Sequence, residues 1–298
     1  MLQNTETKFL VIGSSGQVAS ALKEIADKRF YFVGRPEFDI QNNDHLAQIF
    51  AHTSPSLVIN CAAYTAVDLA ETEENKAYGV NALAVKTLAV QCKIHQVPLI
   101  HISTDYVFDG ALDRPYLESD QTNPLSVYGK SKLAGEHFIK EILPEHIIIR
   151  SSWVFSEYGN NFVKTMVKIS EIKDEVNIVS DQIGCPTAAS NISFVIHKIA
   201  NDMMSRKDIA YGIYNYTDSP AVSWYEFACE IFKMMKSKYS KKVPIVKPIL
   251  SLDYMSAANR PLNSRLDCSL IEKNFGIKSQ GWYAELEQCI EKFIKNKI

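Results

Sequence analysis

Tyr128 and Lys132, two residues that can exchange protons, lie four positions apart in the segment 127–132. On a helix this spacing places a phenol and an ammonium on the same face. A free phenol has a pKa of about 10, and a neighbouring cation favours the phenolate and lowers that pKa. Thr104, at the end of an earlier apolar run, could hydrogen-bond the same substrate oxygen. The three side chains therefore predict proton transfer at a carbonyl or alcohol centre.

The elements that must position these side chains alternate between short apolar runs and helical patterns. The runs are nearly continuous, as is typical of strands buried on both faces of a parallel sheet. This alternation predicts an α/β fold with a doubly wound parallel sheet of the Rossmann type. The expected strands are 8–12, 30–34, 57–61, 98–103, 146–150 and 176–179, and the expected helices are 17–28, 44–52, 75–95, 126–141 and 161–170.

A glycine-rich turn follows the first expected strand and precedes the first helix. Gly13 allows a tight turn, and Gly16 lets the backbone approach a pyrophosphate at the helix amino terminus. Ala19, at the third small position, permits close packing of helix on strand. The strand–turn–helix context therefore predicts a dinucleotide site.

The end of the second expected strand indicates which dinucleotide binds. An acidic residue there favours NAD, whereas an arginine accommodates the 2′-phosphate of NADP. The strand ends at Arg35, and acidic side chains follow only at Glu37 and Asp39. We therefore expect NADPH as the cofactor, with NADH tolerated. The alternative is that Arg35 is an ordinary solvated loop residue.

Beyond residue 205 the strand–helix rhythm loosens. A strand is expected over 211–217, a helix capped by Ser223 follows, and a last helix covers 282–296. We expect a dinucleotide-binding domain over residues 1–155, to which the chain returns around 176–204. A second, smaller α/β substrate lobe is expected over 205–298, with parts of 156–190.

Composition excludes several function classes. The 298 residues are 46% hydrophobic and 22% charged with a formal net charge of −2, so nothing draws the chain to nucleic acid or to an anionic membrane. No apolar run reaches the ~18 residues of a membrane span. Six cysteines form no Cys-x-x-Cys pair, which is typical of reduced thiols in the cytoplasm, and the seven histidines show no metal-ligand spacing. We expect no metal site.

The combination of a dinucleotide turn with Thr104, Tyr128 and Lys132 resembles the extended branch of the short-chain dehydrogenase/reductase superfamily. Longer strings resemble the dTDP-4-dehydrorhamnose reductase family in particular, over residues 8 to about 290. These strings are 60–68, 103–110, 128–136, 150–155, 159–166, 181–187 and 260–266. The resemblance implies NADPH-dependent reduction of the C4 ketone of dTDP-4-dehydro-β-L-rhamnose to dTDP-L-rhamnose.

The resemblance also implies roles for individual residues. Tyr128 would donate the proton, Lys132 would bind the nicotinamide ribose and lower the pKa of Tyr128, and Thr104 would hold the keto oxygen. The expected cofactor contacts come from the first turn, the end of the second strand and the loop after the third strand: Gly13, Gly16, Gln17, Val18, Arg35, Asp39, Ile40, Ala62, Ala63 and Tyr64. The expected sugar-nucleotide contacts, besides Thr104, are Thr65, Val67, Asp105, Tyr106, Trp153 and Arg260.

Simpler interpretations remain open for some of these residues. Trp153 could be a core residue, and Arg260, our candidate for the diphosphate because of its planar bidentate donors, could be a surface ion-pair partner. The acidic side chains of Glu71, Glu73 and Glu74 are expected to be solvated.

Three functions are alternatives to the reduction of dTDP-4-dehydro-β-L-rhamnose. Sugar-nucleotide 4,6-dehydratases carry Asp-Glu after the threonine, whereas here Asp105 is followed by Tyr106, so the base for elimination is missing. A different nucleotide-sugar 4-ketoreductase or an epimerase remains open. So does a non-catalytic subunit, since the regulatory β subunit of methionine adenosyltransferase resembles the same family. A homodimer is compatible with the family.

Overall fold

A six-stranded sheet forms the centre of the computed structural model, which describes residues 7–295. Every pair of neighbouring strands in this sheet is parallel. The spatial order is β2 (Phe30–Val33), β1 (Phe9–Ile12), β3 (Leu57–Asn60), β4 (Leu99–Thr104), β5 (His146–Ser151) and β10 (Gly212–Asn215). The central strands β1, β3 and β5 are buried along their whole length, as their continuous apolar sequences predict.

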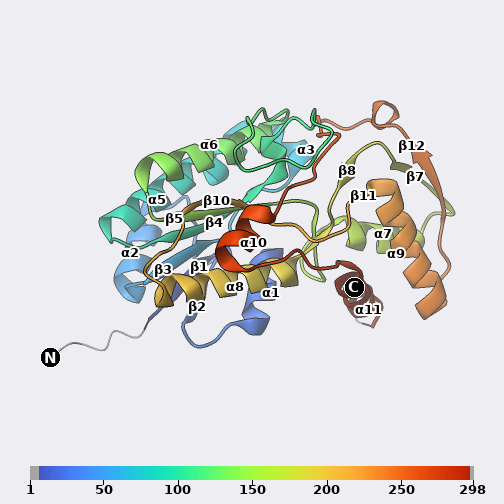
Figure 1. Cartoon of the computed structure of the whole chain (residues 1–298). Helices are drawn as coiled ribbons and strands as arrows, with labels where there is room; N and C mark the ends of the chain where they lie inside the picture. The colour runs from blue at the N-terminus through green and yellow to red at the C-terminus, as the bar shows by residue number, and fades with distance from the viewer. Residues whose placement is uncertain (1–6, 296–298) are drawn as a thin grey trace.

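Helices cover both faces of the sheet (Figure 1). One face is covered by α2 (Asn43–Thr53), α5 (Ala84–Ile94) and α6 (Val127–Ile142), which share an apolar core with the strands. The other face is covered by α1 (Gln17–Ile25), α8 (Ala189–Ser205) and the short α10 (Ser269–Phe275). The predicted fold class, a doubly wound parallel α/β sheet, is confirmed.

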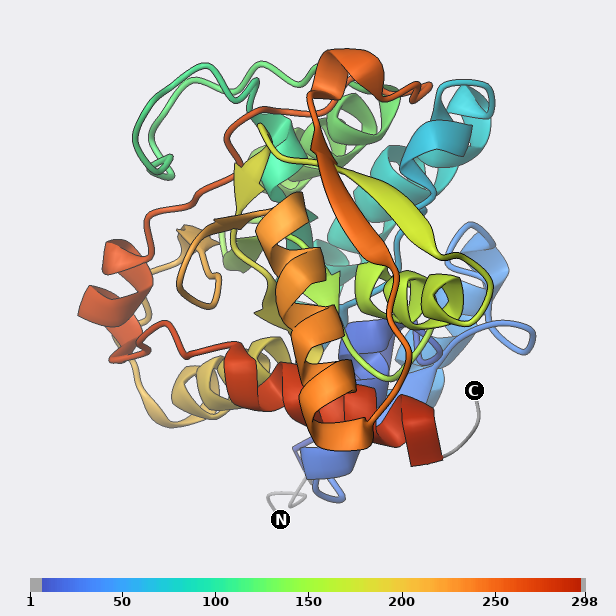
Figure 2. The ribbon, with the colours of Figure 1, turned by 90° about the vertical axis from the view of Figure 1, so that its right-hand side faces the viewer.

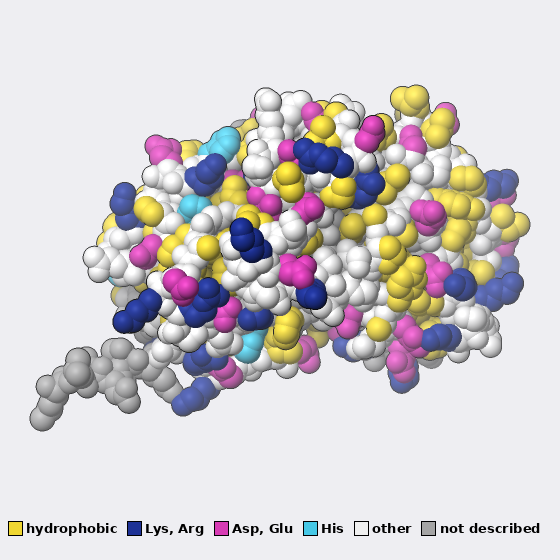
Figure 3. Space-filling view, in the orientation of Figure 1, with side chains coloured by type: hydrophobic (Ala, Val, Ile, Leu, Met, Phe, Trp, Pro, Cys, Tyr) yellow, Lys and Arg dark blue, Asp and Glu magenta, His cyan; other side chains and the backbone are white. Residues whose placement is uncertain are grey.

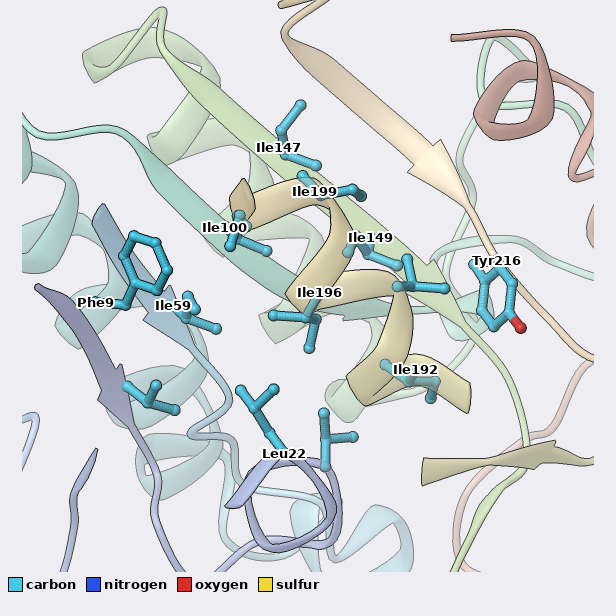
Figure 4. Packing of buried hydrophobic residues seen from close by; sticks show 14 of the residues in the cluster. Phe9, Leu22, Ile59, Ile100, Ile147, Ile149, Ile192, Ile196, Ile199 and Tyr216 are labelled. Carbon is cyan, nitrogen blue, oxygen red and sulfur yellow. The ribbon is translucent and has the colours of Figure 1, made fainter. Parts of the chain in front are cut away.

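The core between the sheet and the helices α1, α8 and α10 is dense in β-branched side chains. Figure 4 shows Ile192, Ile196 and Ile199 of α8 next to Ile147 and Ile149 of β5. All five are fully buried. Burying an isoleucine side chain contributes about 1.5–3 kcal/mol, so this contact holds β5 firmly in place.

The strand order reverses beside β1, because β2 lies on one side of it and β3 on the other. In open α/β sheets, ligands bind outside the carboxyl ends of the strands at such a switch point. The turn that follows β1 and the loop that follows β3 both lie there. The fold thus brings the two predicted cofactor segments to one edge.

A smaller layer is built from later segments. α7 (Phe162–Ser170), α9 (Trp224–Tyr239) and α11 (Tyr283–Lys295) share a separate apolar core. Beside them β7 (Glu175–Val179) pairs in parallel with β12 (Ile245–Ile249), as Figure 2 shows. Two further short pairs are β6 (Val154–Phe155) with β9 (Thr187–Ala188), and β8 (Ile183–Gly184) with β11 (Val222–Ser223).

Two predicted strands lie elsewhere than the sequence placed them. The strand expected at 176–179 is β7, which belongs to the two-stranded pair and not to the main sheet, because Glu175 and Asn177 alternate with buried neighbours and expose one face. The strand expected at 211–217 is β10, which pairs with β5 in the main sheet and not with the smaller layer. The domain boundaries near 155 and 205 remain a prediction, and both outer ends, including Asn296 of the last helix, lie outside the described residues.

The surface carries charges of both signs. On the face shown in Figure 3, Lys and Arg side chains are interspersed with Asp and Glu. Within residues 7–295, no helix combines the length and the apolar character that crossing a membrane requires.

Candidate active site

The turn after β1 is shaped by its contact with the end of β3. Gly13 has a φ of +98°, and a Cβ atom there would lie 2.6 Å from the backbone nitrogen of Ala62. Only glycine fits such a position. At Gly16, by contrast, the nearest atom would be 3.4 Å away, so packing alone does not require glycine there. Gly16 is the N-cap of α1, where glycine is common, and a residue without a side chain also lets a ligand approach this helix end.

The side chains of the other two residues predicted to hold the pyrophosphate, Gln17 and Val18, already contact other parts of the protein. Gln17 accepts hydrogen bonds from Ser156 Oγ and Asn161 Nδ2, both at 2.9 Å, and Val18 packs in the core. Only the backbone of these two residues is free to face a ligand. Gln17 thereby ties the first turn to the segment after β6.

The end of β2 borders a cavity of about 450 Å³, whose lining includes Ser14, Gly34 and Phe38. Of the residues predicted to bind the adenosine end of the cofactor, Arg35 is exposed and Ile40 is buried. Asp39 accepts a hydrogen bond from the backbone of Gln41 at 3.0 Å. The cavity is large enough for part of a nucleotide and lies where the fold predicts one.

The three predicted catalytic residues come from two neighbouring elements. Thr104 ends β4, and Tyr128 and Lys132 lie in the first half of α6. Ser126 caps this helix by accepting a hydrogen bond from the Gly129 backbone at 3.1 Å. A Cβ atom on Gly129 would lie 2.2 Å from the carbonyl oxygen of Tyr106, so this glycine allows α6 to approach the end of β4.

Thr104 is held in place by its neighbours. Its hydroxyl donates to Asp105 Oδ1 at 3.0 Å and accepts from the Tyr106 backbone at 3.2 Å. Tyr106 in turn packs edge-on against Tyr128, with ring centroids 5.7 Å apart. Asp105 is 3% exposed and its second oxygen has no hydrogen-bond partner among the described residues, while burial raises its pKa to about 6.

The pKa of Tyr128 is shifted in the direction opposite to the expected one. Burial raises its pKa to about 12, and a hydrogen bond with Thr104 opposes only part of this rise. Lys132 was expected to lower this pKa. In the structure the Lys132 ammonium donates to the Ile102 carbonyl at 2.6 Å, and burial lowers the pKa of Lys132 to about 8.

The loop after β3 carries the residues predicted to lead toward the nicotinamide and the sugar. Ala62, Ala63, Tyr64 and the exposed Thr65 lie in this loop, and Val67 begins α3 (Val67–Ala70).

Asn81 holds this loop in place and was not predicted from the sequence. It lies in a π-helical turn (Gly79–Leu83) between α4 (Glu74–Tyr78) and α5. Its side chain accepts from the Tyr64 backbone at 2.8 Å and donates to the Tyr64 carbonyl and to Ser131 Oγ, both at 3.0 Å. The signal was a buried amide inside an apolar helix, which requires partners.

The acidic side chains after α3 are not simply solvated. Glu71 accepts a hydrogen bond from the Val127 backbone at 2.9 Å, at the start of α6. A carboxylate at a helix amino terminus is favourable because the first N–H groups lack partners within the helix. Glu73 accepts from the Tyr64 hydroxyl at 2.7 Å. Both residues thus support the site.

Arg260 lies near Asp68 and Tyr106, just beyond the end of β4. It forms an ion pair with Asp68 at 2.6 Å, so the ion-pair interpretation of the sequence describes one of its contacts. Asp68 also accepts from the Ala258 backbone at 3.2 Å. The charge of Arg260 acts on Tyr106, whose pKa is nevertheless raised by burial and by Asp105. Residues from three distant segments therefore meet here, next to the short helix η3 (Ser251–Asp253).

Trp153 lies where the main sheet meets the smaller layer. Its ring stacks on Trp224 of α9, with centroids 3.5 Å apart and planes 7° apart. A Cβ atom on Gly184 would lie 2.5 Å from this ring. Trp153 is half-buried, so one face of it is packing surface while part of the ring stays accessible. Trp224 was not predicted as part of this region.

Comparisons with known proteins agree with this geometry. The family described as "RmlD substrate binding domain" matches residues 7–295. A dTDP-4-dehydrorhamnose reductase from Aggregatibacter actinomycetemcomitans is 42% identical over 94% of this chain and 97% of that protein. The spore coat polysaccharide biosynthesis protein SpsK from Bacillus subtilis is 34% identical over 96% of this chain and 97% of that protein.

Solved structures show the same relationship. A crystal structure of dTDP-4-dehydrorhamnose reductase from Bacillus anthracis in complex with NADP has a TM-score of 0.88 and 33% identity, and covers 96% of this chain and 99% of that one. A Clostridium acetobutylicum dTDP-4-dehydrorhamnose reductase has the same TM-score with 34% identity, over 97% and 100% of the two chains. The family predicted from the sequence is confirmed, and the chain belongs to the dTDP-4-dehydrorhamnose reductase family.

Proposed function

We propose that this chain reduces the C4 ketone of dTDP-4-dehydro-β-L-rhamnose to dTDP-L-rhamnose with NADPH. One observation carries the proposal. In a chain of this family, Thr104, Tyr128 and Lys132 come together at the carboxyl ends of the strands. The glycine turn between β1 and α1 lies at the same edge of the sheet.

The residues present suit a bound dinucleotide. Gly16 carries no side chain at the amino terminus of α1, and the cavity at the end of β2 would hold the adenosine portion. Arg35 follows Gly34, which lines this cavity, and would offer a cation to a 2′-phosphate. NADPH, when bound, supplies the hydride. The solved relative from Bacillus anthracis is a complex with NADP.

The chain's own residues supply the proton. A tyrosine whose pKa is about 12 keeps its proton at neutral pH, so Tyr128 is ready to act as general acid toward the ketone oxygen. Thr104 would orient that oxygen by turning its hydroxyl proton from Asp105 Oδ1 toward the ketone. Lys132 carries the positive charge that stabilises the phenolate left behind.

The sugar nucleotide is assigned to the opposite side of the site. Arg260 offers planar donors to the diphosphate, in exchange for part of its contact with Asp68. The accessible part of Trp153 borders the sugar. Asp105 and Tyr106 lie at the reacting end of this pocket, and Thr65 and Val67 border it from the loop after β3.

The compartment and the assembly are part of the proposal. All six cysteines are unpaired in the structure, which suits a reducing compartment such as the cytoplasm. A homodimer remains a prediction, and light scattering coupled to size-exclusion chromatography measures it directly.

The test is the oxidation of NADPH, followed by absorbance, with dTDP-4-dehydro-β-L-rhamnose generated in situ and the product identified by NMR. Rapid oxidation with formation of dTDP-L-rhamnose is expected. A product with the other configuration at C4 would indicate a different 4-ketoreductase. NADPH binding without oxidation, together with co-purification of a synthetase, would favour the regulatory-subunit alternative.

A further inference from the structure

A buried chain of polar side chains runs from the end of β3 to Lys132. Asn60 and His101 are direct partners in the parallel pairing of β3 with β4. Asn60 Nδ2 lies 3.1 Å from His101 Nδ1, and His101 Nε2 lies 3.3 Å from Lys132 Nζ. Asn60 and His101 are fully buried and Lys132 is 1% exposed, so water does not replace these contacts.

The backbone of Ala62 sets the direction of the hydrogen bonds along this chain. The backbone N–H of Ala62 can only donate, and it donates to Asn60 Oδ1 at 3.0 Å. The amide nitrogen of Asn60 therefore faces His101 and donates to Nδ1. Burial and the charge of Lys132 lower the pKa of His101 well below its ordinary value, so the ring is neutral. Its single proton is then on Nε2, which faces Lys132.

The Nε2–H group has a consequence for Lys132. A protonated ammonium has only donors, whereas a neutral amine offers a lone pair that can accept from Nε2–H. Nζ also donates to the Ile102 carbonyl at 2.6 Å, and this contact is compatible with either form. The hydrogen-bond chain thus favours the amine and makes loss of a proton from Lys132 easier.

Other titratable groups around the chain do not cancel this effect. Glu136 acts on Lys132 but is engaged by Arg150 in a bidentate ion pair, with contacts of 2.6 and 3.0 Å. Burial raises the pKa of the Cys61 thiol to about 12, so this group is uncharged at neutral pH. His146 at the start of β5 acts on His101 only through its charge, and burial lowers the pKa of His146 itself.

We propose that His101, oriented by Asn60, is a positioning residue that makes Lys132 a readier proton donor during ketone reduction. This inference rests on the proposed function. The O–H bond of Tyr128 breaks as its proton moves to the ketone oxygen. A relay of hydroxyl groups or water then passes a proton from the Lys132 ammonium to the resulting phenolate, and the amine left behind accepts a hydrogen bond from His101 Nε2–H. A proton from solvent then restores the ammonium.

The tautomer of His101 is measured directly by ¹⁵N NMR of histidine-labelled wild-type protein, with the signal assigned by its loss in His101→Gln. A neutral ring protonated on Nε2 is expected throughout the neutral pH range. A ring protonated on Nδ1, or an imidazolium, would overturn the proposal. This measurement needs no turnover and no correctly folded Asn60 variant.

Asn60→Asp tests the link to Lys132. A carboxylate keeps the acceptor for Ala62 and places a second acceptor opposite Nδ1, so the ring proton moves to Nδ1 and Lys132 faces a lone pair. The basic limb of the kcat profile, expected near pH 8 in the wild type, then shifts upward by about one pH unit or more. The same Asn60→Asp change in the His101→Gln background is the control. It adds the charge near Lys132 without a ring proton that can move, so the shift there is expected to be smaller.

A moved ring proton without a shift of the basic limb would overturn the proposal. The experiments distinguish a wrong role for His101 from a wrong proposed function. If the wild-type protein does not reduce the keto-sugar, the proposed function is rejected. If it does so while His101 carries its proton on Nδ1, only the role of His101 is rejected.

Discussion

Tyr128 combines two properties that a general acid for ketone reduction needs. Its pKa of about 12 keeps the hydroxyl protonated at neutral pH, and contacts with Thr104 and with the ring of Tyr106 fix its position. The residue and its spacing from Lys132 were predictable from the sequence. The direction of the pKa shift was not, because it depends on burial and on where the Lys132 ammonium points, and both are set by distant strands.

Replacing Tyr128 with phenylalanine tests the proton donor. Tyr128→Phe removes only the hydroxyl, and we expect kcat to fall at least about 100-fold because general acid catalysis is lost. Tyr211→Phe is the matched control, since this tyrosine lies just before β10 at the opposite end of the strands. A kcat close to that of the wild type in Tyr128→Phe would remove Tyr128 from the reaction.

Arg35 is the residue that we expect to select NADPH over NADH. A hydrogen bond to a charged group contributes about 1.5–3 kcal/mol, so Arg35→Ala should lower the ratio of kcat/KM for NADPH to that for NADH about tenfold or more. Steady-state kinetics with both cofactors measure this ratio, with Arg206→Ala at the end of α8 as the control. An unchanged ratio would mean that Arg35 is only a solvated loop residue.

At the scale of elements, most of the strands and helices that position the site were predictable. The continuous apolar runs of β1, β3 and β5 and the caps of α6 and α9 are local signals. The π-helical turn that interrupts the predicted helix over 75–95 could not be predicted, because it depends on the contact between Asn81 and the loop after β3. The roles of Glu71 and Asn81 likewise depend on residues far away in the chain.

The close approach of α6 to β4 makes a prediction at this scale. In Gly129→Ala the new Cβ atom would lie 2.2 Å from the Tyr106 carbonyl oxygen, so the helix must move. We expect a loss of about 1–3 kcal/mol in the free energy of unfolding and a lower kcat, because Tyr128 moves away from Thr104. Urea unfolding and steady-state kinetics measure the two effects.

Gly281→Ala is the control for this experiment, because no atom lies within 4 Å of the added Cβ there. Equal stabilities and activities for the two variants would show that the contact between α6 and Tyr106 does not position the site.

At the scale of the whole molecule, the site lies where a doubly wound sheet meets a smaller helical layer. The class of the main sheet, doubly wound and parallel, was predictable from the sequence, but the order of its strands was not. The strands over 176–179 and 211–217 were each assigned to the wrong layer, because short strands carry no signal of their partner and only packing against α8 and β5 decides where β10 lies.

A buried ion pair joins α6 to β5 and so connects the catalytic helix to the sheet. Arg150 and Glu136 are 3% and 1% exposed in their side chains, and Ser103 donates to the same carboxylate at 2.5 Å. Arg150→Met leaves a buried, unpaired carboxylate, and we expect a loss of about 3–5 kcal/mol in the free energy of unfolding. Chemical denaturation measures it.

The double variant Arg150→Met with Glu136→Gln removes the unpaired charge and should regain part of this loss. If the single variant were as stable as the wild type, the pair would not hold α6 on the sheet.

The central claim is that hydride from NADPH reaches C4 of the sugar. Wild-type protein is supplied with NADPH that carries deuterium at both C4 positions of the nicotinamide, together with the dTDP-linked keto-sugar, and the product is examined by NMR. We predict dTDP-L-rhamnose with one deuterium at C4 of the sugar. Oxidation of NADPH without deuterium at that carbon, or dTDP-L-rhamnose that carries none, would contradict the claim.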